Sequence, residues 1–403
     1  RRSRTSASAC EMVILHSFKI VWDEPSPSTT SFLLIVQAVF SDAVAEEKTF
    51  VGADGAFWDE DANWEPAGVP TAVDAVTVTN AVKCYNVLAA GSLSVEGGQL
   101  LISSKAENDT LLAASTWPDD AYVTGVGLFI VDDVSVGGTG ELAFGARLGE
   151  LELPDAEIGG ALALADTARM TVRARPYPDD GERDEKGRPV LTNFYRTASA
   201  VKVGGALALS GTAQLRVECD IRTGNPLRFD VGGNVTIGEG AKVNARMGGF
   251  GWVDGTTQST SSGASWGVGG TYAGFKYAPY APGAPSGNYF DFWTRGGGVI
   301  WIKTPGRIVL DGTLDASGAC RHQFDPRGTS GGSSGGGIWL VCSKLVAGEQ
   351  ALALACGGYC SGKDGAGGGG GSVCWARKVA DVKLAQLAEG KSVRGCTFAD
   401  EIE

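Results

Sequence analysis

Histidine, excess positive charge and long apolar runs are all missing from this chain. Only two of its 403 residues are histidine, His16 and His322, and Asp plus Glu outnumber Lys plus Arg by 46 to 34. Two histidines are too few for most histidine-based metal sites and disfavour a Ser-His-Asp triad. Nucleic-acid binding needs clustered cations, which a net charge of −12 does not favour. No stretch reaches the roughly 18 apolar residues of a membrane-spanning helix. We expect no cofactor, no nucleic-acid partner and no membrane span.

Glycine is present in excess, at 60 of 403 residues, which is about twice ordinary usage. No Gly-X-Y period accompanies it, so a collagen-like chain is excluded. A chain of this length ordinarily forms two or three domains, but repeat proteins escape that expectation.

One pattern occurs four times between residues 129 and 245. Apolar residues fall at offsets 0, 4, 6, 12 and 14 from four starting positions: Ile130, Ile158, Val203 and Val231. The intervals are 28 residues (130 to 158), 45 (158 to 203) and 28 (203 to 231), and Gly-Gly follows three of the starts. The longer interval contains a polar segment of mixed charge, which indicates a 28-residue repeat interrupted once by a loop. A solvated loop is one interpretation of that segment, and a cation site is the other.

Each repeat contains apolar pairs of period two, which are typical of short strands with one inward face. Examples are Leu162-x-Leu164, Met170-x-Val172 and a third pair, Leu227-x-Phe229 or Leu151-x-Leu153. Three strands per turn predict an all-β solenoid, a right-handed parallel β-helix whose stacked rungs bury one apolar column. A β-propeller needs about four strands in a repeat of ~40 residues, which the 28-residue spacing disfavours.

The repeats divide the chain into four parts. We expect a leader over 1–45, an N-terminal cap with irregular first rungs over 46–120, β-helix rungs over 121–377 with loop insertions at 176–197 and 248–295, and a C-terminal cap or tail over 378–403. The apolar run 32–40 and Ala43-Val44-Ala45 are typical of a secretory signal peptide cleaved after Ala45, which predicts a secreted or cell-surface protein. A wrongly extended gene start, with 1–30 not structural, is the alternative.

Glycine runs and aromatic residues dominate the C-terminal half. Glycine runs lead into strand-like segments at 300–302, 338–340 and 373–375, which predicts longer rungs of the same helix with glycine loops at one corner. The aromatic-rich loop before them holds 11 of the chain's 34 aromatic residues between 250 and 293. Either it packs a small core of its own, or its rings form a platform for sugars. The candidate ligand-binding residues are Trp252, Trp266, Tyr272, Tyr277, Tyr289 and Trp293.

Six of the nine cysteines follow residue 319. In an exported protein they could form disulfides between rungs, and in a tight stack they could equally stay buried thiols. Only Cys356 and Cys360 form a close pair, so a zinc site is disfavoured and we predict no metal.

A short motif opens the expected mature chain. It reads Trp58-Asp59-x-Asp61-x-Asn63-Trp64, then Gly68-x-Pro70, then Asp74 before Val76-x-Val78. This motif resembles the opening of secreted bacterial right-handed parallel β-helix proteins of the autotransporter-passenger and adhesin type. The resemblance implies an architecture more than an activity. Two tryptophans and a polar turn would cover the open end of the helix, where strand edges are otherwise unpaired. The alternative is a tryptophan pair that binds sugar.

Three sets of residues give only weak evidence for catalysis. Adjacent rungs could align the carboxylates of a hydrolase, either Glu218 and Asp220 with Asp230, or Asp311 with Asp315. One glycine loop holds Arg321, His322 and Asp325, which could supply the base and the charge neutraliser of a lyase. Aspartate is also common at turns for structural reasons. We therefore predict an adhesive or glycan-binding scaffold without catalytic activity, whose partner is a polysaccharide or a host or cell-surface glycan. The alternative is a polysaccharide lyase or glycoside hydrolase of the pectin-lyase-like β-helix type.

Overall fold

The computed structural model describes residues 44–85, 87–103, 127–145, 156–175, 199–220, 224–250, 279–285, 295–319, 332–358, 367–377 and 397–398. These residues belong to one compact unit, Val44–Glu403. They form β-strands almost throughout, and the one helical element among them is the short 3-10 turn η1 (Asp61–Asn63). All of the predicted signal peptide except its last two residues, Val44 and Ala45, lies outside the described residues, so export stays a prediction.

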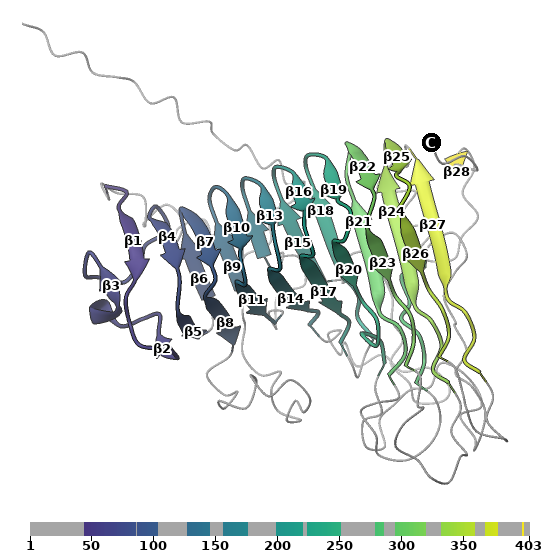
Figure 1. Ribbon diagram of the computed structural model, residues 1–403, viewed down its shortest axis with the longest axis horizontal. Coiled ribbons are helices and arrows are strands. Elements are labelled where there is room, and N and C mark those ends of the chain that lie inside the picture. Colours follow the sequence, from purple (N-terminus) through teal and green to yellow (C-terminus); the bar gives the residue numbers. More distant parts are fainter. Residues whose placement is uncertain are drawn as a thin grey trace, which may run out of the picture. The chain divides into compact units, whose positions relative to one another are not determined.

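The strands form three sheets (Figure 1). Sheet A contains β1 (Glu47–Phe50), β3 (Trp64–Glu65), β4 (Ala75–Val78), β7 (Ser92–Glu96), β10 (Val134–Gly137), β13 (Leu162–Leu164), β16 (Leu207–Leu209), β19 (Val235–Ile237), β22 (Arg307–Leu310) and β25 (Lys344–Ala347). Sheet B contains β2 (Ala56–Phe57), β5 (Ala81–Tyr85), β8 (Gln99–Ser103), β11 (Glu141–Phe144), β14 (Arg169–Arg173), β17 (Gln214–Glu218), β20 (Lys242–Asn244), β23 (Thr313–Asp315) and β26 (Leu352–Leu354). Sheet C contains β6 (Val87–Ala90), β9 (Gly127–Ile130), β12 (Ala156–Ile158), β15 (Ser199–Val203), β18 (Leu227–Val231), β21 (Val299–Lys303), β24 (Gly337–Cys342), β27 (Ser372–Arg377) and β28 (Thr397–Phe398).

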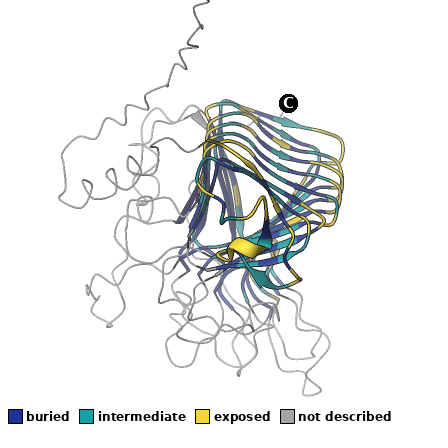
Figure 2. Cartoon of the chain, turned by 90° about the vertical axis from the view of Figure 1, so that its left-hand side faces the viewer, coloured by how far each residue is buried: buried dark blue, intermediate teal, exposed yellow. Residues whose placement is uncertain are grey.

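Along the regular part of the chain, each strand pairs with the strands three positions before and after it, and these pairings are parallel. Each coil therefore contributes one strand to every sheet, and the coils lie one behind another when viewed along the stack (Figure 2). This pairing confirms the predicted parallel β-helix with three strands per coil. The right-handed sense stays a prediction.

The apolar residues of the 28-residue repeat are in register from coil to coil. In sheet A, Leu162 pairs with Leu207, and Leu207 pairs with Val235. All three are at most 1% exposed and belong to the core. The coil with the 45-residue interval keeps this register, because its extra residues leave between β14 and β15. The predicted apolar column is confirmed.

The first coils are more regular than we expected. Leu93 pairs with Val134 and Leu100 with Leu142, so the supposedly irregular rung has the same register as those that follow. The sheet-C strand before Ile158 begins at Ala156. The pair Leu151-x-Leu153, which we assigned to that strand, lies outside the described residues.

The motif near the N-terminus covers the end of the stack. The ring centroids of Trp58 and Trp64 lie 4.6 Å apart, and Trp64 donates from Nε1 to the Trp58 carbonyl at 2.8 Å. Asp61 accepts the Val69 N–H at 3.0 Å, and β3 pairs antiparallel with β1. These contacts place both tryptophans and the polar turn at the end of sheet A, where we predicted a cap. Both tryptophans are buried, so they do not form the exposed sugar platform that was the alternative.

The opposite end also carries an antiparallel strand. β28 pairs with β27 in sheet C and lies within the stretch 378–403 that we predicted as a C-terminal cap or tail. An antiparallel final strand interrupts the parallel pattern by which further coils would add, and it covers part of an otherwise unpaired edge. The other residues of this stretch lie outside the described residues.

One corner of the helix is the exit for the long insertions. From residue 103 to residue 372, each segment outside the described residues lies between a sheet-B strand and the next sheet-C strand. The insertions at 176–197 and 248–295 both lie between a sheet-B strand and a sheet-C strand, and so do the glycine loops after β23 and β26, which we predicted to leave at one corner. Residues 176–197 themselves lie outside the described residues, so both interpretations of this loop, solvated or cation-binding, stay predictions.

Glycine-rich limbs carry the last three coils beyond the sheets at this corner. We call the segments 245–249, 295–298, 316–319, 332–336, 355–358 and 367–371 the glycine stem. Within one coil, the Gly336 N–H donates to the Ala316 carbonyl at 2.8 Å, and between coils the Gly297 N–H donates to the Ser334 carbonyl at 2.9 Å. A Cβ built on Gly336 would lie 1.9 Å from the Gly298 carbonyl oxygen. The limbs thus pack backbone against backbone, which accounts for much of the glycine excess.

Gly336→Ala should destabilise the protein by about 1–3 kcal/mol, because rigid backbone on both sides must move to admit a methyl group. The midpoint of urea unfolding, followed by circular dichroism, measures this change. Gly370→Ala is the matched control, since its Cβ would lie 3.9 Å from the nearest atom, the Ala355 carbonyl oxygen. Equal midpoints for the two variants would contradict the packing of the stem.

Candidate functional site on the outer face of sheet B

Side chains, most of them polar, form two rows on the outer face of sheet B. Strand pairing places the first row in the order Gln99, Glu141, Arg169, Gln214 and Lys242. The second row runs Leu101, Ala143, Thr171, Arg216 and Asn244. Because successive residues of a strand point to opposite faces, the buried residues between these positions fill the core and leave the rows outside.

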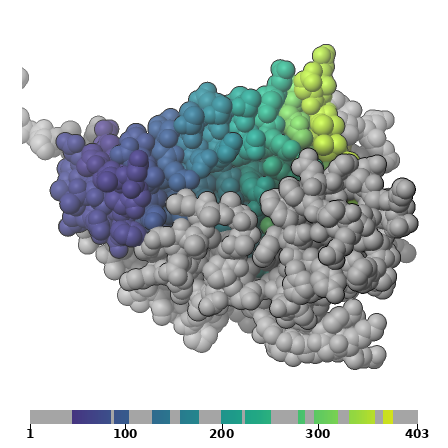
Figure 3. Space-filling model, turned by 60° about the horizontal axis from the view of Figure 1, so that its bottom comes forward, coloured from purple at the N-terminus to yellow at the C-terminus, as the bar shows by residue number. Residues whose placement is uncertain are grey.

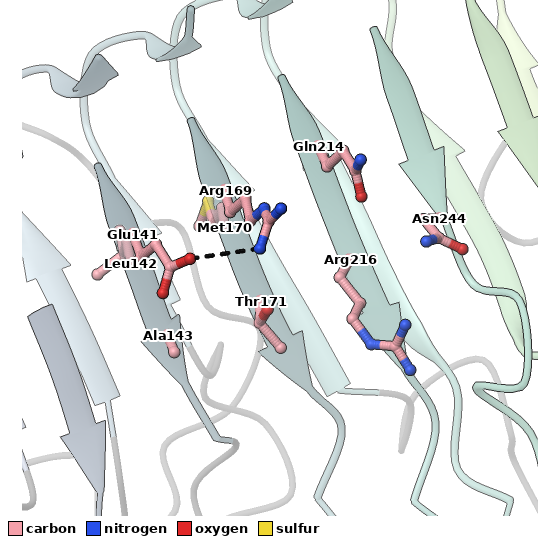
Figure 4. A pocket seen from close by; sticks show the side chains of 9 residues that line it. All are labelled: Glu141, Leu142, Ala143, Arg169, Met170, Thr171, Gln214, Arg216 and Asn244. Carbon is pink, nitrogen blue, oxygen red and sulfur yellow. Dashed lines mark ion pairs between the residues drawn. The ribbon is translucent and has the colours of Figure 1, made fainter. Parts of the chain in front are cut away.

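A shallow hollow of about 400 Å³ lies over four neighbouring strands of this face (Figure 4). Its lining residues come from β11, β14, β17 and β20: Glu141, Leu142, Ala143, Arg169, Met170, Thr171, Gln214, Arg216 and Asn244. Leu142 and Met170 belong to the core, so the polar members of the list provide the chemistry of the hollow. They include two guanidinium groups, two amides, a hydroxyl and one carboxylate.

Glu141 and Arg169 form a loose ion pair across this hollow. Their closest atoms, Oε1 and Nη1, are 3.6 Å apart, and the side chains are 39% and 66% exposed. The Gln99 side-chain amide donates to the other Glu141 oxygen at 2.8 Å. An ion pair this exposed contributes little to stability. Because most of the Arg169 side chain is exposed, its guanidinium is accessible to a ligand.

Glu218 lies next to the hollow in a cluster of arginines. It accepts from Arg173 Nε at 2.9 Å and from Arg216 Nε at 2.6 Å, and its side chain is only 9% exposed. Burial acts to raise the pKa of this carboxyl. The positive charges of Arg173, Arg295 and Arg216 outweigh burial and hold the pKa well below its ordinary value. Glu218 is therefore a structural anion among cations and is not a proton donor near neutral pH.

Arg295 connects this cluster to the glycine stem. Its Nε and Nη2 lie 3.3 Å from the Gly249 carbonyl oxygen, on the opposite limb of the aromatic-rich loop. Burial lowers the pKa of the Arg295 guanidinium, and the charge of Glu218 opposes that effect. The two limbs of the loop are thus fastened to each other and, through electrostatic attraction, to sheet B.

Asp315 occupies the C-terminal side of the same face. It accepts from Lys242 Nζ at 2.8 Å and from the Ser317 N–H at 3.0 Å. Burial acts to raise the pKa of Asp315, but these hydrogen bonds lower it overall. Asp74 in the N-terminal cap shows the same balance, with a lowered pKa despite burial. Within the described part of the chain, every carboxyl with a shifted pKa has it lowered, whereas a general acid needs it raised.

The first predicted catalytic set is divided between two sheets, and its third member, Asp220, is buried two residues after the end of β17. Glu218 lies on sheet B, whereas Asp230 lies on sheet C, where it is bound by Arg228 at 2.7 Å. Asp311 accepts the Gln350 N–H at 3.0 Å, a structural role at a turn. Arg321, His322 and Asp325 lie outside the described residues.

The six predicted ligand-binding aromatics also lie outside the described residues: Trp252, Trp266, Tyr272, Tyr277, Tyr289 and Trp293. Sequence reasoning missed the polar rows of sheet B instead. A usable signal was present in the repeat itself, because the residues at offsets 11 and 13 from each start lie between the apolar positions 12 and 14 and point outward. Offset 11 is Glu141, Arg169, Gln214 and Lys242, and offset 13 is Ala143, Thr171, Arg216 and Asn244.

The described cysteines are thiols. Cys84, Cys219, Cys342 and Cys374 are buried, Cys356 is exposed, and none of these five is in a disulfide. Burial raises the pKa of Cys84 and Cys219 to about 12 and that of Cys342 and Cys374 to about 11. For these positions the buried-thiol interpretation holds, with Cys356 as the exposed exception. Cys320, Cys360 and Cys396 lie outside the described residues.

Comparisons with known proteins give no relatives: no protein-family model, curated protein or solved structure matches this chain. Among the described residues, no group of three or more His, Cys, Asp and Glu side chains is placed to hold a metal ion. The same residues include no helix with the length and apolar character to cross a membrane. The site must therefore be interpreted from its own chemistry.

Glu218→Gln should lower the free energy of unfolding at pH 7 by about 3 kcal/mol, because it leaves the partly buried Arg173, Arg216 and Arg295 without their counter-charge. The pKa of Glu218 is lower in the folded protein than the unfolded value of about 4.3. Its contribution is therefore fully present above that pH and is lost progressively as the pH falls below it. The difference between the unfolding midpoints of the two proteins should therefore stay constant from pH 7 to about pH 5 and should narrow, without vanishing, as the pH is lowered to about 3.

Glu141→Gln is the control for this experiment, since it removes a carboxylate from the same face but from an exposed pair. We expect a change below about 1 kcal/mol. Equal losses for the two variants, or a difference that does not depend on pH, would contradict the role assigned to Glu218.

Proposed function

We propose that this protein is a secreted or cell-surface scaffold that binds a polysaccharide along the outer face of sheet B and does not cleave it. The observation that carries the proposal is the hollow over β11, β14, β17 and β20. Its side chains offer both donors and acceptors, which suits sugar hydroxyl groups. A polymer with repeating polar groups also suits a face whose rows repeat at the strand spacing of about 4.8 Å.

The carboxylates favour binding over catalysis. Glycoside hydrolysis ordinarily needs two carboxyl groups facing each other across the scissile bond, one with a raised pKa. Glu141 is the only carboxylate among the residues lining the hollow, and the neighbouring Glu218 is neutralised by arginines. A polysaccharide lyase or hydrolase remains the alternative function, and a product assay separates it from a binding scaffold.

Export fits the position of the folded unit. The first strand, β1, begins at Glu47, two residues after Ala45, where cleavage is predicted. Cleavage there would remove the leader and leave every described strand intact. A covered stack of coils also suits an adhesive scaffold, because it holds a repeating outer face in a fixed arrangement.

Protein expressed with its leader and collected from the medium should begin at Glu46 and should bind members of a glycan array without releasing reducing ends or unsaturated products. Gln214→Ala and Asn244→Ala should each weaken binding roughly 2- to 10-fold, the effect of losing one hydrogen bond. Thr236→Ala, an exposed position on the outer face of sheet A, should leave binding unchanged.

Two outcomes would overturn this proposal. One is an array without any bound glycan. The other is product release that is lost in Glu141→Gln, which would establish the enzymatic alternative. Retention of the protein in the cell with residues 1–45 attached would contradict export but not polysaccharide binding.

A further inference from the structure

We infer that the bound polysaccharide is anionic, and that Arg169 and Arg216 bind its carboxylate or sulfate groups. This inference rests on the proposed function and adds the chemical class of the ligand. It starts from a contrast in charge. The whole chain carries a net charge of −12, yet cations gather on and beside the outer face of sheet B: Arg169, Arg173, Arg216, Lys242, Arg246 and Arg295.

The described carboxylates on this face are fewer, and two of them are already engaged. Glu218 is held by the arginine cluster, and Asp315 is held by Lys242. Glu141 is bound to Gln99 and lies 3.6 Å from Arg169. Among the described residues, the charge of this face is therefore positive, and the cations that line the hollow are the two arginines.

Arg216 has the geometry of a preorganised anion receptor. Its Nε donates to Glu218 at 2.6 Å, which fixes the plane of the guanidinium group. Within the described residues, its terminal amino groups donate to no protein acceptor, and the side chain is 38% exposed on the edge of the hollow. A guanidinium held in this way matches the paired oxygens of a carboxylate or sulfate and loses little entropy on binding.

Arg169 supplies the second charge on the neighbouring coil. It lies on β14, which pairs directly with β17, and Figure 4 shows it projecting on the same side of the sheet as Arg216. Gln214, the direct strand partner of Arg169, precedes Arg216 by two residues on β17 and also lines the hollow. Two cations beside an amide suit a polymer that alternates charged groups with hydroxyl groups. A neutral glycan would use the amides alone.

The experiment compares dextran sulfate, polygalacturonate and uncharged dextran as ligands of the whole secreted protein. We expect the two anionic polymers to bind, with affinity that falls as salt is raised, and dextran not to bind. Arg169→Gln should weaken binding of the anionic polymers roughly tenfold or more, since it removes a charge-assisted contact. This side chain is largely exposed, so the variant should fold, which its unfolding midpoint verifies.

Arg307→Gln provides the matched control, because Arg307 is an exposed arginine on sheet A. Equal weakening by the two variants would mean general electrostatic attraction and would overturn the inference. Binding of dextran as strong as that of dextran sulfate would also overturn it, while leaving polysaccharide binding intact. If none of the three polymers binds and the glycan array is also empty, the proposed function fails together with the inference.

Discussion

Backbone hydrogen bonding between successive coils, kept in one register, is the constraint on which this structure depends. Each coil must return to the same height and position so that its strands pair with those of the coil before. The chain meets this requirement over intervals of 28, 45 and 38 residues. It does so by confining the additional residues to the corner between sheets B and C. The surface follows the same order, with the sequence colours succeeding one another along the stack (Figure 3).

Two features of composition follow from this constraint. Aliphatic residues occur at the inward positions because the coils share one core. Glycine occurs where two backbones meet without room for a side chain. Gly204 is an example, since a Cβ there would lie 2.1 Å from the Gly159 carbonyl oxygen in the adjacent coil. At such corners the register is maintained by backbone contacts and not by side-chain packing.

The same register creates the candidate site. Residues at equivalent outward positions in consecutive coils become neighbours on sheet B, although they are 28 to 45 residues apart in the sequence. Glu218 and the partly buried Arg295 extend this principle, because the return of the chain through the glycine stem brings a distant guanidinium beside the arginine pair on sheet B. The proposed polysaccharide face is thus a consequence of stacking.

The sequence predicted the inward half of this structure and missed the outward half. Period-two pairs such as Leu162-x-Leu164 identify strands because burial demands apolar residues at alternate positions. No such pattern marks Arg169, Arg216 and Asn244, because any polar residue can occupy a solvent-facing position. Their importance emerges only after the register is known. The cap at Trp58 and Trp64 could be predicted, because an open stack has an apolar end that must be covered.

Pairwise cysteine cross-linking on the outer face of sheet A tests this register most directly. Ala163 and Ala208 are direct partners, and neighbouring strands lie about 4.8 Å apart, within the range of a disulfide. Ala163→Cys combined with Ala208→Cys should form a disulfide on mild oxidation, identified by peptide mapping. Ala163→Cys combined with Thr236→Cys, two coils apart, should not form one. A cross-link in the second pair, or its absence in the first, would contradict the stacking on which the fold and the candidate site rest.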